Sequence, residues 1–349
     1  VRRLARMRPG DLIYCIYDRE HKEYYEFGDN VRHAAIGFPA RHPILWKLWF
    51  DYSIPSFLRK SNADCFISLD GYNTLSSNIP TIIFGHDLAP LHFPQHMKWS
   101  HRHYYKRYLP QFINKANAIV ANSVYTKNDI EETLGVPKEK VHMAYSGLND
   151  YFKELDRDTI DRVRARHTNG RPYFIFTGTR SPRKNLIRLI DAFDLVKEKH
   201  ELEHQLLIVG NSGWKKQAIL DRYHSSDNKS DIQLLTNVSD SALSQLIGAA
   251  DTAVFVSLFE GFGLPIIEAM ACHVPVITSN ISAMPEVAGD AAMLVDPYDT
   301  RAIAEAMYIS VNDNELRKRL VQKGAERCFA FNWDDQANIV NELIDEVIK

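Results

Sequence analysis

The feature that most constrains the fold of this chain is an alternation of short apolar runs with longer helical stretches. Each run holds four to six residues and is rich in β-branched or aromatic side chains, as buried strands are. The runs cover residues 12–17, 65–69, 81–84, 118–121, 173–176, 205–209, 232–235, 252–256 and 274–278. Strands that alternate with helices are typical of parallel sheets with helices on both faces. The pattern therefore predicts an α/β, doubly wound architecture.

Length and local composition indicate more than one domain. A chain of 349 residues with 45% hydrophobic and 25% charged residues has ordinary globular composition and is too long for one typical core. The sequence turns polar between residues 150 and 170, and Gly-Arg-Pro at 170–172 precedes a new strand. We therefore expect one domain over residues 1–168, a second over 169–330, and a final amphipathic helix over 331–349 that could cover either.

The charge balance excludes a chain that binds nucleic acid as a whole. The formal net charge is -2 and the sequence pI is about 6.7, whereas nucleic-acid binders carry a basic excess. The two parts differ in sign: residues 1–150 hold 19 Lys+Arg against 15 Asp+Glu, and the remainder holds 23 against 29. We expect no nucleic-acid partner.

Cysteine usage and hydropathy predict a cytoplasmic protein. The four cysteines are widely spaced and form no Cys-x-x-Cys pair, which suits reduced thiols. No apolar stretch approaches the roughly 18 residues that a membrane span needs. Any contact with the inner face of a membrane would therefore be peripheral. The first residues read as the end of a helix stopped by Pro9 and Gly10, so we expect sequence before Val1.

A candidate ligand site follows the apolar run at 252–256. Gly261 and Gly263 allow a loop to approach a ligand closely, and Pro265 suits the first turn of a helix. A strand, a glycine loop and a helix N-terminus form an anion site. Glu260 would lie in the loop and Glu268 about one turn into the helix, so both carboxylates can face one cleft.

Three cations follow the run at 173–176, again at a strand end. These are Arg180, Arg183 and Lys184, and they precede a helical stretch. Ligands of open α/β sheets bind at the carboxyl ends of strands, so these cations and the two carboxylates are expected at one edge. Carboxylates suited to hydroxyls, with cations suited to phosphates, describe a nucleotide sugar better than a simple phosphate.

These segments carry a family resemblance. Residues 259–265 and 268–271, with 178–185 upstream, resemble family four of the retaining glycosyltransferases, and the match spans most of the second half. The resemblance implies the GT-B fold: two Rossmann-like α/β/α domains that face each other across a cleft, with the C-terminal helix returning to the first. Residues 209–214 and 236–239 resemble the base-binding loops of the family, and 84–88 resemble its loop with an active-site histidine.

The resemblance implies roles for particular residues. His86, Glu260 and Lys184 are expected to be catalytic; Glu268 is expected to hold the ribose and Glu260 to meet the transferred sugar. The expected donor-binding set is Gly178, Arg180, Arg183, Lys184, Gly210, Val238, Glu260, Gly261, Phe262, Gly263, Leu264 and Glu268. Lys184, an arginine and the helix N-terminus would neutralise the diphosphate, so we expect no metal and no cofactor. Thr179 stands where relatives place an arginine, which leaves Arg180 and Arg183 both open for that role.

The resemblance also sets the expected reaction. It is transfer of a hexosyl unit, mannosyl or similar, from a nucleotide-diphosphate sugar to a glycan or lipid-linked acceptor, with retention. The mechanism stays open between a double displacement and a same-face substitution. The alternatives are a sugar-nucleotide epimerase or a phosphorylase of the same fold, and a donor-binding subunit without catalysis. The last is kept because the first strand and glycine loop of the family do not precede residue 1.

A second histidine-rich region lies outside these motifs. His92, His96, His101 and His103 have no carboxylate or cysteine at zinc spacing, so a metal site is disfavoured. The neighbouring residues 98–108 mix basic with aromatic side chains on a predicted helix. This mixture fits a surface that contacts an acceptor or a membrane, with an ordinary solvated helix as the alternative.

Overall fold

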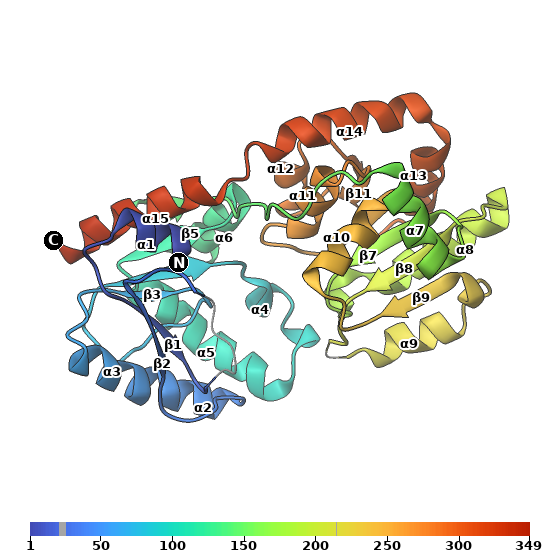
Figure 1. Ribbon diagram of the computed structural model, residues 1–349. Coiled ribbons are helices and arrows are strands. Elements are labelled where there is room, and N and C mark those ends of the chain that lie inside the picture. The colour runs from blue at the N-terminus through green and yellow to red at the C-terminus, as the bar shows by residue number, and fades with distance from the viewer. Residues whose placement is uncertain (21–25, 214) are drawn as a thin grey trace. The chain divides into compact units, whose positions relative to one another are not determined.

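The computed structural model describes residues 1–20, 26–213 and 215–349. The chain divides into two compact units: Val1–Tyr145 together with Asn332–Lys349, and Ser146–Phe331. Each unit combines parallel β-sheet with helices (Figure 1). This confirms the predicted α/β class.

Within its described residues, the first unit contains two separate parallel sheets. The larger one has the order β3-β4-β5-β6, and the smaller one pairs β1 with β2. The strands are β1 (Ile13–Tyr17), β2 (Val31–Ala35), β3 (Phe66–Ser68), β4 (Thr81–Gly85), β5 (Ala118–Ala121) and β6 (Val141–Met143). The helices are α1 (Arg2–Met7), α2 (Pro43–Leu48), η1 (Trp49–Ser53), α3 (Ile54–Lys60), α4 (Ala89–His92), η2 (Pro94–His96), α5 (Trp99–Lys115), α6 (Val124–Leu134), η3 (Lys138–Lys140) and α15 (Trp333–Ile348).

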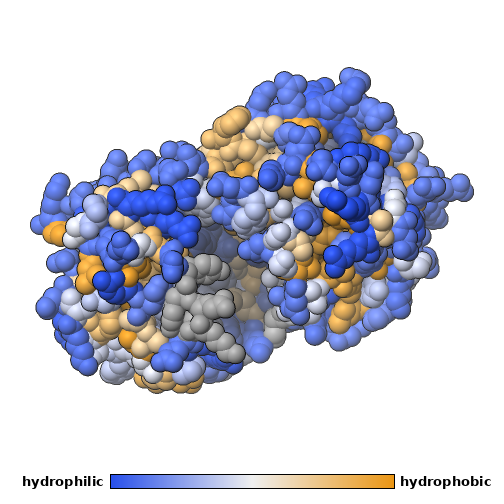
Figure 2. Space-filling model, in the orientation of Figure 1, coloured by the Kyte–Doolittle hydropathy of each residue, from blue (hydrophilic) through white to orange (hydrophobic). Residues whose placement is uncertain are grey.

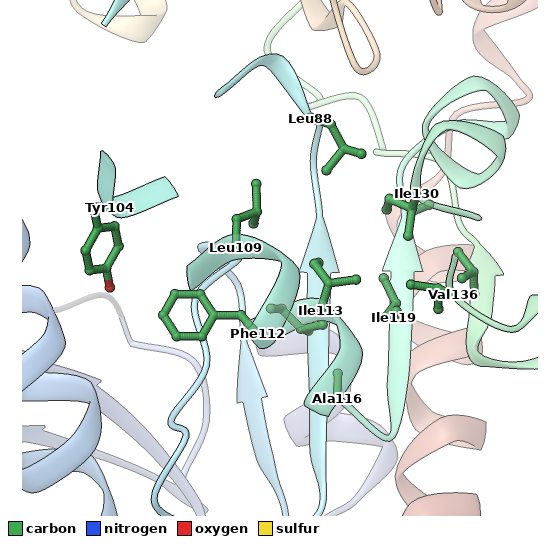
Figure 3. Packing of buried hydrophobic residues seen from close by; sticks show 12 residues of the cluster. Leu88, Tyr104, Leu109, Phe112, Ile113, Ala116, Ile119, Ile130 and Val136 are labelled. Atoms are coloured by element: carbon green, nitrogen blue, oxygen red, sulfur yellow. The ribbon is translucent and has the colours of Figure 1, made fainter. Parts of the chain in front are cut away.

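Helices cover both faces of the larger sheet because strand side chains alternate between faces. On one face, Ile83 and Ile119 pack against residues of α5 and α6, among them Phe112, Ile113 and Ile130 (Figure 3). On the other face, Ile82 and Val120 pack against α15 through a cluster that includes Val340, Leu343 and Ile344. The C-terminal helix therefore completes the core of the first unit, as the resemblance implied.

The second unit is built on one parallel sheet of order β12-β11-β10-β7-β8-β9. The strands are β7 (Tyr173–Thr177), β8 (Gln205–Val209), β9 (Ile232–Leu235), β10 (Thr252–Phe255), β11 (Val276–Ser279) and β12 (Met293–Val295). The helices are α7 (Arg157–Thr168), η4 (Pro182–Lys184), α8 (Leu186–His200), α9 (Gln217–His224), η5 (Lys229–Asp231), α10 (Asp240–Gly248), α11 (Leu264–Ala271), α12 (Met284–Ala288), α13 (Thr300–Asn312) and α14 (Asn314–Cys328). The strand order reverses between β7 and β10, which is where doubly wound sheets bind ligands.

Three strands were not predicted from the sequence: β2, β6 and β12. Each pairs with a neighbour that was predicted, at one edge of its sheet. β6 is the short segment Val-His-Met, and β2 includes the polar pair Arg32 and His33, so no apolar run marks these two strands. β12 lies in the apolar run 291–295, which the sequence analysis passed over. Pairing with a neighbouring strand, rather than local hydrophobicity, creates β2 and β6.

The segment 146–168, which we expected in the first domain, packs with the second unit instead. The Arg164 guanidinium of α7 donates to the Ala249 carbonyl at 2.9 Å and pairs with Asp251 at 3.0 Å. The Tyr151 carbonyl accepts from the Ser244 hydroxyl at 2.8 Å. Polar contacts of this kind hold the segment on the second unit. The polar composition of the segment does not reveal which unit these contacts join, so the boundary could not be predicted from it.

Candidate functional site

The loop between β10 and α11 has the backbone geometry expected of a ligand loop. Gly263 is the N-cap of α11 with φ +109, a left-handed conformation that favours glycine. Pro265 lies in the first turn of the helix, where a missing N–H costs nothing. The helix therefore begins at the ligand edge of the sheet, where the positive end of its dipole favours an anion.

Glu260 lies at the centre of a buried ion cluster. Its Oε1 accepts from Lys184 Nζ at 2.5 Å and its Oε2 from Arg183 Nη1 at 2.8 Å. Burial alone would raise the pKa of Glu260, but the Lys184 ammonium and the Arg183 guanidinium hold that pKa below its usual value. The side chains of Glu260 and Lys184 are 12% and 15% exposed, so the three charges form one ion cluster that carries a net +1.

The two loops that bring this cluster together are also joined through their backbones. The Leu258 N–H donates to the Arg183 carbonyl at 2.8 Å, and the Arg183 guanidinium also donates to the Phe259 carbonyl. Asn185, only 3% exposed, donates from its side-chain amide to the carbonyls of Val256 and Pro297 at 2.9 and 2.7 Å. These hydrogen bonds therefore fix the positions of the three charges relative to one another.

A small pocket lies against this cluster. Lys184, Glu260, Gly263, Thr177, Ser257 and Met284 are among the residues that line it. The Thr177 hydroxyl is buried there and has no hydrogen-bond partner among the residues that the structure describes. A buried hydroxyl without a partner is unusual and marks a position where a ligand or water can bind. Sequence reasoning passed over Thr177 because it ends an ordinary apolar strand.

The loop after β8 approaches the loop after β7 so closely that only glycine fits. A Cβ atom on Gly210 would lie 2.1 Å from the Gly178 carbonyl oxygen, and both residues have positive φ, +148 and +136. Arg180 is only 7% exposed, and its Nη2 donates to the Ser212 hydroxyl at 2.9 Å. Arg180 therefore joins these two loops, whereas Arg183 contacts Glu260.

The predicted set is otherwise distributed along the same sheet edge. Val238 is half-buried between β9 and α10, in a loop that is tied to the β8 loop because the Asn237 N–H donates to Asn211 Oδ1 at 3.2 Å. Leu264 is 39% exposed at the start of α11. Gly261 and Phe262 are buried, and the Phe262 ring meets the Phe331 ring edge-on at 5.5 Å. Phe262 therefore packs in the core of the second unit.

Glu268 lies in α11 and has a different electrostatic environment from Glu260. Burial, followed by the negative charge of Asp240, raises the pKa of Glu268 to about 7. Asp240 is the first residue of α10. Burial, and after it the negative charges of Asp240 and Glu268, raise the pKa of the Tyr151 hydroxyl. Sequence reasoning missed Asp240; its place directly after a strand-end loop and an N-cap serine is the signal that could have found it.

His86 belongs to the first unit. It follows β4, is exposed, and its Nε2 donates to the Leu69 carbonyl at 2.6 Å. The structure thus brings Glu260, Lys184, Arg183 and Glu268 into one unit at one sheet edge, and places His86 in the other. Its catalytic role stays a prediction.

Two further properties were searched over the described residues. Within residues 1–20, 26–213 and 215–349, no group of three or more His, Cys, Asp or Glu side chains is arranged to hold a metal ion. Over the same ranges, no helix is both long and apolar enough to cross a membrane. The result of the metal search does not test whether the reaction needs a metal ion, so independence of metal stays a prediction.

The fold defines a class of protein. Two units on parallel sheets are the GT-B plan, shared with the crystal structure of WaaG, a glycosyltransferase involved in lipopolysaccharide biosynthesis. That match has a TM-score of 0.77 at 14% identity and covers 98% of this chain and 94% of WaaG. The structure of Anabaena Alr3699/HepE in complex with UDP-glucose matches with a TM-score of 0.66 at 18% identity, over 83% of this chain and 80% of that one.

Family models then identify the chain. Residues 1–152 match the model of Glycosyltransferase Family 4, and residues 157–327 match that of Glycosyl transferases group 1. The chain is a member of glycosyltransferase family 4. Among curated proteins, the O-antigen chain mannosyltransferase B of Escherichia coli is 28% identical over 251 residues, which cover 72% of this chain and 66% of that protein. The chain thus spans just under two thirds of that relative's length.

Proposed function

We propose that this chain transfers a hexosyl unit, mannosyl or similar, from a nucleotide-diphosphate sugar to a glycan or lipid-linked acceptor, with retention of configuration and without a metal. The observation that carries the proposal is the buried cluster of Glu260, Lys184 and Arg183 at the strand ends, with Glu268 on the adjoining helix. The mannosyl choice is supported by the E. coli relative, and the nucleotide sugar by the UDP-glucose bound to the Anabaena neighbour.

The cluster suits the stabilisation of a leaving diphosphate. An ammonium has three N–H donors and a guanidinium has five, so both cations can hold Glu260 and still donate to phosphate oxygens. Their net +1 charge and the N-terminus of α11 are aimed at the same sheet edge, where negative charge grows as the glycosidic bond breaks. Donors that are already in place need no reorganisation during the reaction.

The two glutamates would divide the donor between them. Glu268, in the helix and near Asp240, is proposed to accept hydrogen bonds from the ribose hydroxyls. Glu260, beside the cations, is proposed to contact the transferred sugar, and His86 of the first unit to act on the acceptor side. Arg180 supports the β8 loop, which is proposed to contact the base together with Val238.

A thermal-shift screen over nucleoside diphosphates and their sugars, with and without EDTA, tests this proposal. A ligand at 100 times its dissociation constant adds about 2.7 kcal/mol to the free energy of unfolding. We expect one nucleotide series to give such a shift and EDTA to leave it unchanged, because cations and a helix N-terminus replace a metal.

Two results of this screen would contradict the proposal, and a product assay then separates the alternative functions. Failure of every nucleotide to stabilise the chain would contradict the proposed site, and loss of the shift on chelation would contradict independence of metal. With the donor known, a product assay follows. Epimerisation needs no acceptor, phosphorolysis needs phosphate, and a binding subunit gives no turnover with acceptor supplied.

A further inference from the structure

Residues 86–92 of the first unit carry His86 and are anchored in the core at one point. The segment starts at the end of β4 and includes α4. Leu88 is 1% exposed and packs in the buried cluster that also contains Ile130 of α6 (Figure 3). The core therefore fixes the middle of the segment, whereas each end depends on contacts of its own.

The start of the segment is attached to α6 by a weak contact. The His86 carbonyl accepts from the Thr126 hydroxyl at 3.5 Å, which is the long limit of a hydrogen bond. The His86 ring is held separately, because its Nε2 donates to the Leu69 carbonyl at 2.6 Å. Both contacts act on His86 alone, so they do not hold α4 in place.

The end of the segment is attached to α6 by a stronger contact, between His92 and Asp129. His92 Nε2 lies 2.8 and 2.9 Å from the two carboxylate oxygens of Asp129. The Thr133 hydroxyl, one turn further along α6, donates to the same carboxylate at 2.9 Å. Hydrogen bonds to a charged acceptor are about twice as strong as neutral ones. The two donors therefore orient the carboxylate, and the carboxylate holds the last residue of α4.

Burial makes this contact stronger than an ordinary surface pair. Hydrophilic residues prevail on the face of the molecule that Figure 2 shows, and ion pairs at such a surface contribute little because water competes for both partners. The Asp129 side chain is only 10% exposed, and that of His92 is 34% exposed. Removal of the His92 donor would leave a largely buried carboxylate with one hydrogen bond fewer, which is costly. The contact therefore fixes α4 relative to α6.

We infer that Asp129 is a positioning residue for sugar transfer: through His92 it holds residues 86–92 on α6 and so fixes the place of His86. The inference rests on the proposed function, in which His86 acts on the acceptor side. A group that takes part in the reaction must be held close to its productive position, since a displacement of about 1 Å can cost roughly 10²-fold in rate. Asp129 acts through the backbone of the segment, because its own carboxylate is engaged by His92 and Thr133.

Hydrogen exchange on the whole chain, followed by mass spectrometry, tests the anchoring without a substrate. In Asp129→Asn, the amides of residues 86–92 are expected to exchange about tenfold faster or more, the equivalent of one lost hydrogen bond to a charged group. The amides of β4 and β5 should exchange as in the wild type, because the core is unchanged. His92→Leu should behave like Asp129→Asn, whereas His92→Gln, which keeps an N–H donor, should protect the segment as the wild type does.

Transfer kinetics test the role in the reaction. The assay uses the nucleotide sugar that the thermal-shift screen selects as donor and octyl α-mannoside as acceptor. Asp129→Asn should lower kcat about 10- to 100-fold and leave KM for the nucleotide sugar unchanged, because the donor-site residues belong to the second unit. The double variant Asp129→Asn/His92→Leu should lose no more than either single variant, as expected of two residues that act as one unit.

Two controls remove contacts that do not reach the segment. Thr133→Val removes the other donor to the Asp129 carboxylate, and Asp334→Asn removes a carboxylate that pairs with Arg3 at 2.6 Å in the same unit. Both should match the wild type in hydrogen exchange and in kcat.

Three results would overturn the inference. These are unchanged exchange of residues 86–92 in Asp129→Asn, an equal increase of exchange throughout the first unit, or a higher KM for the nucleotide sugar with kcat unchanged. A wild type that binds nucleotide but transfers no sugar would contradict the proposed function instead, and hydrogen exchange would still decide whether Asp129 holds the segment.

Discussion

Replacing Glu260 by glutamine is expected to reduce sugar transfer by about 10² to 10³-fold, the range for loss of one preorganised group in an active site. Affinity for the nucleoside diphosphate should be retained or should increase. The carboxylate lies between Lys184 and Arg183, and its removal frees N–H donors of both cations for the phosphates. Contact with the transferred sugar and the fixed position of the cations are what the variant loses.

Two measurements make this prediction specific. Turnover and nucleoside-diphosphate affinity should be measured on the same protein, with thermal unfolding and circular dichroism to show that the fold is intact. Ser282→Ala is the matched control, because it removes the hydroxyl that accepts the Glu260 N–H at 3.1 Å and leaves every charge in place. If Glu260→Gln transfers sugar as fast as the wild type, Glu260 is only a loop carboxylate held by its two cations.

Glu268→Gln is expected to have opposite effects on stability and on binding. The pKa of Glu268, raised to about 7 by burial and by Asp240, lies above its value in the unfolded chain. The folded protein therefore keeps a proton that the unfolded chain releases between about pH 4.5 and pH 7, and its stability falls as pH rises through that window. A neutral glutamine removes this loss.

The variant should accordingly be more stable than the wild type at pH 8, by up to about 3 kcal/mol, and equally stable near pH 4. Its affinity for nucleotide should be lower by about 1 to 3 kcal/mol at pH 8, where the wild-type carboxylate accepts hydrogen bonds from the ribose. Wild-type affinity should rise between pH 6 and pH 8, and that of the variant should not. Chemical denaturation and calorimetry at each pH measure both. A variant that is less stable than the wild type at pH 8 would contradict the assigned environment of Glu268.

The predictable part of the fold was the part specified by local sequence. The runs at 205–209 and 232–235 became β8 and β9 with the same bounds, and every residue of β8 is buried, which is why its run is mostly apolar. The three-residue strand β6 arises from pairing with its neighbour and carries no such signal, whereas β12 lies in the apolar run 291–295, which was overlooked. Local composition also misled at 146–168, where Arg164 makes its contacts with residues more than 80 positions away in the sequence.

The candidate site, like the fold, was predicted only in part from the sequence. Glu260, Lys184 and Glu268 could be found from their spacing around strand ends, since parallel strands bring those loops to one edge. That Lys184 and Arg183 pair with Glu260, and that Arg180 is buried against Ser212, depends on side-chain directions. Spacing does not contain that information. Asp240 matters because its charge acts on Glu268, and Thr177 matters because its hydroxyl is buried in the pocket. Both properties depend on the folded surroundings, so neither residue was predicted.

The central claim is that Glu260 and Glu268 hold different parts of one nucleotide sugar. Calorimetric titration of the Glu260→Gln and Glu268→Gln variants with the nucleoside diphosphate and with the intact donor tests it most directly. Glu268→Gln should weaken both ligands alike, whereas Glu260→Gln should weaken only the intact donor, each by about 1 to 3 kcal/mol. An equal loss of both ligands in Glu260→Gln, or no loss of either in Glu268→Gln, would contradict the account.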